Sequence, residues 1–268
     1  DLVRSRGLGD VYKRQAVGIL CVMPNFQMPP LTKFINGGGP IVGGPVIPFI
    51  FITIACGALS GFHATIGTGT TPKMLGNERD VLFVGYGAML TEGFVAVMAL
   101  VAACVLVPAD YFAINSSADK FAELGMTVQN LPMLEAEVQE SLAARPGGSV
   151  SLAVGMAYIF SRIPWIEELM AYWYHFAIMF EPGFILTAVD AGTRVGRFFL
   201  QEMIGRYIAP KFNDKHWVPG IIITSLIFTG TWGYLVYSGD IASIWPLFGI
   251  SNQLLASVTL LIGTTVLL

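Results

Sequence analysis

The sequence contains little charge. Only 12% of its 268 residues are Asp, Glu, Lys or Arg, about half of the roughly 25% that is typical of soluble domains. A chain with so few charges cannot cover a water-facing surface, which argues against a soluble globular enzyme. The net charge of −3 gives no basis for a nucleic-acid partner. The three cysteines lie in apolar runs without CxxC spacing, so they predict small buried side chains and no metal or redox centre.

Sequence motifs of enzymes are also missing. The chain contains neither HExxH nor the GxSxG turn of a serine nucleophile. The glycine-rich stretch NGGGPIVGG lacks the GK[ST] of a P-loop, so the sequence does not indicate an ATP-driven machine. We therefore expect no enzyme, and no cofactor.

Hydrophobic residues make up 54% of the chain, and they lie in runs of about 20 or more, each long enough to cross a hydrocarbon layer of roughly 30 Å. This pattern predicts an all-α, polytopic membrane protein. We expect a truncated span at 16–23 and further spans at 46–66, 81–107, 165–191, 219–238 and 241–268.

Residues 1–15, DLVRSRGLGDVYKRQ, differ in character from everything that follows. They are polar, carry six charged residues and stop where an apolar run begins. They resemble translated adapter sequence, so we exclude them from the reasoning on fold and topology. Without these residues the sequence opens inside one apolar run and closes inside another, LLIGTTVLL, and we expect it to be a fragment of a larger protein.

The connecting segments indicate an orientation. Loops 72–80 and 192–218 hold seven Lys and Arg residues against four on the opposite side, which favours a cytoplasmic position for these two loops. Residues 108–149 then form a polar, acidic outer loop. The apolar stretch 150–163 is only 14 residues long, so we interpret it as a re-entrant or interfacial helix.

Ionisable groups inside apolar segments are costly and are candidate functional sites. Glu92 shares a helix stripe with small residues at three- and four-residue spacing, which predicts that its carboxylate faces a packed neighbour. It is then either a protonatable coupling site or substrate contact, or a structural glutamate bonded by neighbouring helices.

His63 follows Gly57 and Gly61 and precedes the run TIGTGTTPK. A membrane helix that loosens around glycines exposes backbone polar groups, which is tolerated only where they line a cavity or are buried in protein. Secondary transporters bind their substrates at such discontinuities. A glycine-rich packing seam with a hydrogen-bonded histidine is the alternative.

Further polar residues lie in the later spans. His175 precedes Glu181, after which Pro182-Gly183 is expected to interrupt the helix, and Glu181 is a candidate proton carrier or a protonated structural residue. Asp190 and Arg194 form either a helix-end pair or an intracellular gate. Asn252 and Gln253 are expected to bond between helices or to line the permeation path.

Four long stretches carry a family resemblance: PFIFITIACGALSGFHATIGTGTTPKML, FVGYGAMLTEGFVAVMALVAACVL, YHFAIMFEPGFILTAVDAGTRVGRFFLQ and WPLFGISNQLLA. Through them the chain resembles the carbon starvation protein A family from residue 16 onward. Its members are larger bacterial inner-membrane secondary transporters with a broken-helix, inverted-repeat (LeuT-like) core. The resemblance implies proton-coupled uptake of pyruvate or peptides during carbon limitation.

The resemblance also assigns positions. The family positions that carry over are Ser60 and His63 of the SGFHA segment, Thr70, Thr71 and Lys73 of the GTTPK turn, Glu92, and DAGTR as Asp190 to Arg194. Of these, Ser60, His63, Thr70, Thr71 and Glu92 are expected to belong to the substrate or proton pathway. Pro182-Gly183 departs from the family, which usually has an alanine and a bulky residue there. The implied driving force is the proton motive force, with another coupling cation left open. A membrane-embedded nutrient sensor without flux is the alternative function, and an intramembrane enzyme is a distant third.

Overall fold

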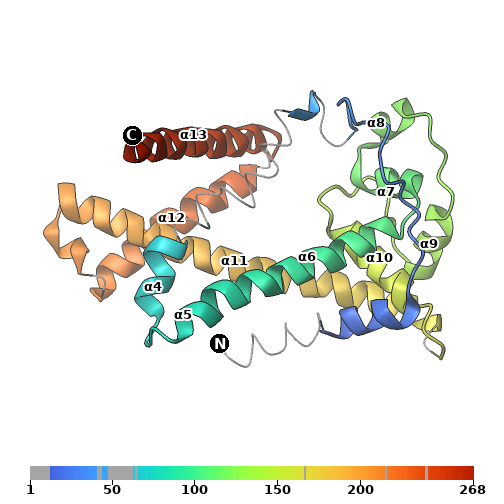
Figure 1. The fold of residues 1–268 in the computed structure, drawn as a ribbon, viewed down its shortest axis with the longest axis horizontal. Helices are drawn as coiled ribbons and strands as arrows, with labels where there is room; N and C mark the ends of the chain where they lie inside the picture. The colour runs from blue at the N-terminus through green and yellow to red at the C-terminus, as the bar shows by residue number, and fades with distance from the viewer. Residues whose placement is uncertain are drawn as a thin grey trace. The chain divides into compact units, whose positions relative to one another are not determined.

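The computed structural model of the chain describes residues 13–40, 44–47, 63, 66–165, 167–214, 216–238 and 241–268. In these ranges the regular structure is helical and contains no strand, which confirms the all-α fold (Figure 1). Residues 13–22 form an unlabelled helix. The labelled elements are η1 (Ile66–Thr70), α4 (Thr71–Met74), α5 (Asp80–Leu82), η2 (Phe83–Gly87), α6 (Ala88–Cys104), α7 (Pro108–Asn115), α8 (Ala118–Glu123), α9 (Leu131–Val138), α10 (Ser149–Phe160), η3 (Glu167–Leu169), α11 (Met170–Tyr207), η4 (Pro210–Asn213), α12 (Val218–Ser238) and α13 (Ile241–Leu267).

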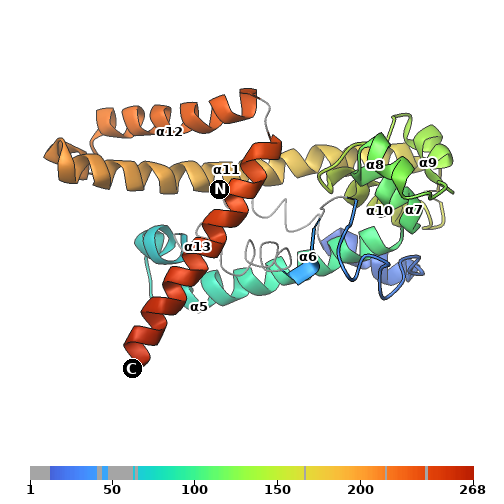
Figure 2. The same ribbon diagram turned by 90° about the horizontal axis from the view of Figure 1, so that it is seen from above.

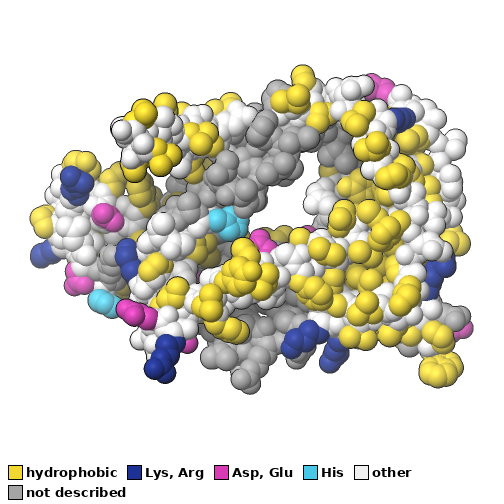
Figure 3. Space-filling model, viewed as in Figure 1, with side chains coloured by type: hydrophobic (Ala, Val, Ile, Leu, Met, Phe, Trp, Pro, Cys, Tyr) yellow, Lys and Arg dark blue, Asp and Glu magenta, His cyan; other side chains and the backbone are white. Residues whose placement is uncertain are grey.

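Within the described ranges, four helical stretches are long and apolar enough to cross a membrane: Asp80–Cys104, Met170–Tyr207, Val218–Ser238 and Ile250–Leu267. Large apolar side chains stand exposed on these helices, such as Phe94 at 48% and Leu261 at 68%, and yellow side chains follow α6 across the surface in Figure 3. A water-soluble protein rarely exposes such continuous apolar faces. The expected span at 46–66 lies largely outside the described residues.

The described chain forms two compact units. The first comprises Asp1–Val46 and Leu82–Ile185, and the second comprises Ile47–Val81 and Leu186–Leu268. Residues 108–149 belong to the first unit and form the short helices α7, α8 and α9, where the sequence indicated only a polar loop. Their apolar side chains pack against α10, including Ile114, Leu134 and Val138.

Helix α10 lies in the core of the first unit. Nine of its 12 residues are buried, because a helix that is apolar on all sides has no face for water. At about 18 Å it is too short to span the hydrocarbon layer. Its hydrophobic side chains thus pack against protein within this unit, and the interpretation of 150–163 as a re-entrant or interfacial helix stays a prediction. Gly155 permits this packing, since a Cβ atom there would lie 2.1 Å from the Ala102 carbonyl oxygen of α6.

Two acidic residues organise the segment between α6 and α10. The Asp110 side chain, 1% exposed, accepts hydrogen bonds from the backbone N–H groups of Gln129 (2.8 Å) and Asn130 (2.9 Å). Glu135 accepts bonds from the N–H groups of Leu142 (2.7 Å) and Ala143 (3.2 Å). These carboxylates replace water as acceptors for backbone groups. No cluster of potential metal ligands occurs among the residues that the structure describes.

Helix α11 corrects two expectations. Pro182 lies inside the helix, which continues across it, so the expected interruption at Pro182-Gly183 is wrong. Proline removes only the hydrogen bond to the carbonyl four residues earlier, and membrane helices tolerate this loss. The helix also continues past Ala191 to Tyr207, so 192–207 is helical and Asp190 lies within the helix. With 38 residues, α11 is about 57 Å long, more than the hydrocarbon layer requires.

In the second unit, the C-terminal part of α11 packs along α12 (Figure 2). Gly196 marks the closest approach, because a Cβ atom at this position would lie 2.2 Å from the ring of Phe228. Within the run TIGTGTTPK, residues 66–70 form the π-helical turn η1, and α4 follows from Thr71. Such π-turns occur often at functional sites. Gly57 and Gly61, around which the sequence predicts a loosened helix, lie outside the described residues.

Candidate functional site

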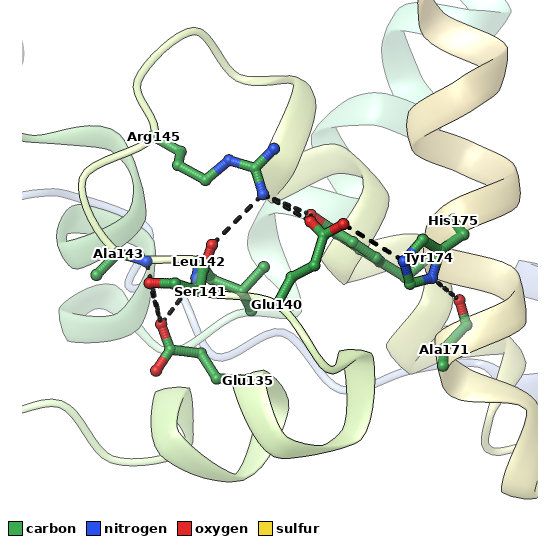
Figure 4. A network of polar contacts seen from close by, with 9 residues as sticks. All are labelled: Glu135, Glu140, Ser141, Leu142, Ala143, Arg145, Ala171, Tyr174 and His175. Atoms are coloured by element: carbon green, nitrogen blue, oxygen red, sulfur yellow. Dashed lines mark hydrogen bonds and ion pairs between the residues drawn. The ribbon is translucent and has the colours of Figure 1, made fainter.

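A polar network joins the beginning of α11 to the segment after α9 (Figure 4). The Glu140 carboxylate lies at its centre. It accepts hydrogen bonds from Arg145 Nη1 at 2.9 Å and from the Tyr174 hydroxyl at 3.2 Å, while Arg145 also donates to the Tyr174 oxygen at 3.1 Å. The network thereby attaches the segment after α9 to the start of a predicted span.

Electrostatics favour the ionised forms of the central pair. The hydrogen bond from Arg145 holds the pKa of the Glu140 carboxyl below its ordinary value, and the bond to Glu140 raises the pKa of Arg145. Both side chains remain partly exposed, at 38% and 40%, so solvent screens the pair.

His175 extends this network through both of its ring nitrogens. Nδ1 lies 2.7 Å from the Ala171 carbonyl oxygen, and Nε2 lies 3.4 Å from Glu140 Oε1. Both partners are acceptors, and only a doubly protonated imidazolium can donate to both at once. Sequence reasoning could not derive this contact, because it did not bring Glu140 to His175.

Two other acidic candidates of the first unit lie apart from the network. Glu181 is half-buried in α11, and among the described residues it has no hydrogen-bond or ion-pair partner. Glu92 is exposed on α6, and the residues of α6 that are buried are Met98 and Ala102. Helix α6 therefore meets α10 along a face other than that of Glu92, and the expectation that Glu92 faces a packed neighbour stays a prediction.

The second unit contains the candidates near the GTTPK turn. Thr70 is 7% exposed at the end of η1, and Thr71 begins α4. His63 is exposed, while Ser60 lies outside the described residues. Lys73 of α4 lines a cavity of about 360 Å³ together with Gln201, Glu202, Phe212 and Asn213. The structure thus places the lysine of this turn beside the end of α11.

Buried amides also occur in this unit. Asn252 of α13 is 6% exposed, and its Nδ2 atom has no acceptor within the described residues; Gln253 beside it is half-buried. Gln201 of α11 is 1% exposed, and neither of its amide atoms has a partner there. Sequence reasoning missed Gln201, because an isolated glutamine in FFLQEM resembles an ordinary polar helix position.

Asp190 and Arg194 form an ion pair on α11, with 3.1 Å between Oδ2 and Nη2. Arg194 Nη1 also lies 3.4 Å from the Met74 sulfur. The pair borders a cavity of about 180 Å³ between α11 and α12. The cavity is lined by Asp190, Thr193, Arg194, Arg197, Ile221 and Ser225. Of its two arginines, sequence reasoning selected only Arg194, because Arg197 counted among the charges of a loop.

Apolar spanning helices with ionisable groups on their faces define the chain as part of a polytopic α-helical membrane protein. The family model described as carbon starvation protein CstA matches residues 9–268. The chain belongs to this family. No solved structure matches it, and the LeuT-like inverted repeat stays a prediction.

Three curated relatives show how similar the chain is to known members. It is 54% identical over 252 residues to "Peptide transporter CstA" of Bacillus subtilis. It is 44% identical over 298 residues to "Pyruvate/proton symporter BtsT" of Escherichia coli and 46% identical over 277 residues to "Peptide transporter CstA" of the same species. Each comparison covers 94% of this chain but only 42%, 41% and 39% of the relative. The chain thus spans about two fifths of the length of these relatives.

Proposed function

We propose that the protein containing this chain is a secondary active transporter of the bacterial inner membrane that imports pyruvate or short peptides together with protons. The carrying observation is the similarity, over 94% of the chain, to proteins named as peptide transporters and as a pyruvate/proton symporter. Four apolar helices of membrane-spanning length support a multi-pass protein. The proposal includes no cofactor, no enzymatic step and no nucleic-acid partner, with the proton motive force as the source of energy.

The proposal assigns proton binding to α11. His175 faces two acceptors, and an imidazolium could donate to both of them. Glu181 follows six residues later and has no partner among the described residues, which suits a carboxyl group that exchanges its proton. Glu92 of α6 is a third candidate for this pathway. The remaining predicted contacts, Ser60, His63, Thr70, Thr71, Asn252 and Gln253, belong to the substrate path, with Asp190 and Arg194 as its gate.

Transport of labelled substrate into proteoliposomes tests the proposal. The full-length protein is reconstituted, an inward proton gradient is imposed, and uptake of labelled pyruvate is followed with and without a protonophore. We expect accumulation that collapses with the gradient. Unlabelled pyruvate and di- and tripeptides are then compared as competitors, which separates the two substrate classes.

Two outcomes would contradict this function. Uptake that ignores the gradient would refute proton coupling. Absence of uptake for both pyruvate and peptides, with substrate binding retained, would favour a membrane-embedded nutrient sensor over a transporter. Full-length Glu92→Gln protein provides a further comparison, since an unchanged pH dependence would assign Glu92 to packing.

A further inference from the structure

The cavity between α11 and α12 carries an excess of positive charge. Its lining contains two guanidinium groups, Arg194 and Arg197, and one carboxylate, Asp190. Asp190 is already paired with Arg194 at 3.1 Å. Arg197 has only the ring of Phe198, 4.5 Å from its guanidinium carbon, and no carboxylate partner among the described residues. One cationic group at this cavity therefore lacks an anion.

Two hydroxyl groups of the same lining are also available. Hydroxyl side chains in membrane helices usually bond to a backbone carbonyl one turn earlier. Thr224, next to the cavity on α12, does so with Gly220 at 2.7 Å, and Thr231 does so with Ile227 at 2.8 Å. Thr193 and Ser225 line the cavity and have no hydrogen bond within the described residues. A ligand in the cavity would meet two hydroxyls that are not already used.

We infer that this cavity binds the carboxylate of the transported substrate, with Arg197 as the principal contact and the hydroxyls of Thr193 and Ser225 as additional donors. The inference rests on the proposed function. Pyruvate and peptides, the substrates in the names of the relatives, share one charged group, which is a carboxylate. A guanidinium binds a carboxylate through two parallel hydrogen bonds, so one site explains how related proteins accept both substrates.

The test uses the full-length protein in proteoliposomes and the variant Arg197→Gln. With whichever of labelled pyruvate or dipeptide the wild type accumulates, we expect KM to rise about 10- to 100-fold, as for loss of a charge-assisted hydrogen bond. The maximal rate is retained. Arg206→Gln is the matched control, since Arg206 lies on the same helix, over the Tyr207 ring, and does not line the cavity. Its KM should equal that of the wild type.

A second readout tests recognition of the carboxylate itself. The wild type should be inhibited by pyruvate or a dipeptide and not by the corresponding amide, pyruvamide or the C-terminally amidated peptide. Arg197→Gln should lose this discrimination. Arg197→Lys keeps the positive charge but cannot form two parallel hydrogen bonds to a carboxylate, so it should retain part of the discrimination.

Two smaller substitutions keep the inference testable if Arg197→Gln fails to fold. Ser225→Ala and Thr193→Val remove hydroxyls that bond to nothing in the described chain, so they should leave folding intact and raise KM by a smaller factor. Unchanged KM and unchanged discrimination in all foldable variants would overturn the inference while transport persists. Failure of the wild type to accumulate either substrate would instead overturn the proposed function.

Discussion

The substitution Gly155→Ala adds one methyl group to α10 and tests how closely this helix packs against α6. A Cβ atom at this position would lie 2.1 Å from the Ala102 carbonyl oxygen and 2.7 Å from its carbonyl carbon. Both obstacles are backbone atoms, so no side-chain rotation can make room. In Gly155→Ala, α10 and α6 must therefore separate by about 1 Å, which loosens a core that contains Val105, Met156 and Ile159.

The cost follows from two opposing terms. Inserting a methyl group into a packed core destabilises by roughly 1–3 kcal/mol, and a rigid backbone obstacle favours the upper half of this range. Replacing glycine by alanine inside a helix stabilises the folded state by up to about 1 kcal/mol, because alanine has the higher helix propensity. The net loss in the free energy of unfolding is then about 1–2 kcal/mol. For a unit of this size it lowers Tm by about 2–8 °C.

Thermal unfolding of the full-length protein in detergent measures this loss. Gly93→Ala is the matched control, because Gly93 lies in α6 and a Cβ atom there meets nothing within 4 Å. Its Tm should stay level or rise by a few degrees, opposite in sign to Gly155→Ala. A Gly155→Ala protein at least as stable as the wild type would refute the close approach of the two helices.

Three further substitutions test the polar contacts of the first unit. Asp110→Asn should lower the free energy of unfolding by about 1–3 kcal/mol, since its amide group would face a backbone N–H; equal stability of Asp110→Asn and the exposed Asp119→Asn would contradict this. Glu140→Gln should lower Tm at neutral pH, and the difference should vanish in acid. Because Arg145 lowers the pKa of Glu140, the stabilisation is complete above the ordinary pKa of a glutamate and is lost as the pH falls through the lowered value. His175→Gln keeps a donor to Ala171 but binds no proton, so the pH profile of uptake should change; an unchanged profile would remove His175 from the proton path.

The long apolar helices of the described ranges were predictable because the bilayer imposes a minimum length on an apolar run, and their crossing of the membrane stays a prediction. Val218–Ser238 agrees with the expected 219–238 to within one residue. The end of α11 was not predictable in the same way. Pro182 predicts a break and the charges after Ala191 predict a loop, yet the helix continues to Tyr207. Packing of Gly196 against Phe228 supports these later turns, and such a tertiary contact has no local signal.

The polar stretch 108–149 shows a second limit of sequence reasoning. Its acidic composition predicts a solvated loop, because composition does not reveal which carboxylates are buried. Asp110 and Glu135 instead accept bonds from backbone groups up to 20 residues away. Those bonds fold the stretch into helices around α10 and bring Glu140 to His175. One feature of the sequence did indicate this arrangement: the segment that forms α10 is uniformly apolar but too short to span a membrane.

The candidate sites show which polar residues sequence can select. Charge inside an apolar run is visible in the sequence, and it identified His175, Glu181, Asp190 and Arg194. Hydroxyl groups give no such signal. Thr224 and Ser225 are adjacent and chemically alike, so the sequence does not show which of them is available to a ligand. In the structure Thr224 bonds to the backbone of its own helix, whereas Ser225 lines the cavity that also contains Arg197. In an apolar helix a hydroxyl can donate to a carboxylate only if a backbone carbonyl does not already accept its hydrogen. The pattern of these local bonds, more than the count of polar residues, therefore locates the proposed carboxylate site.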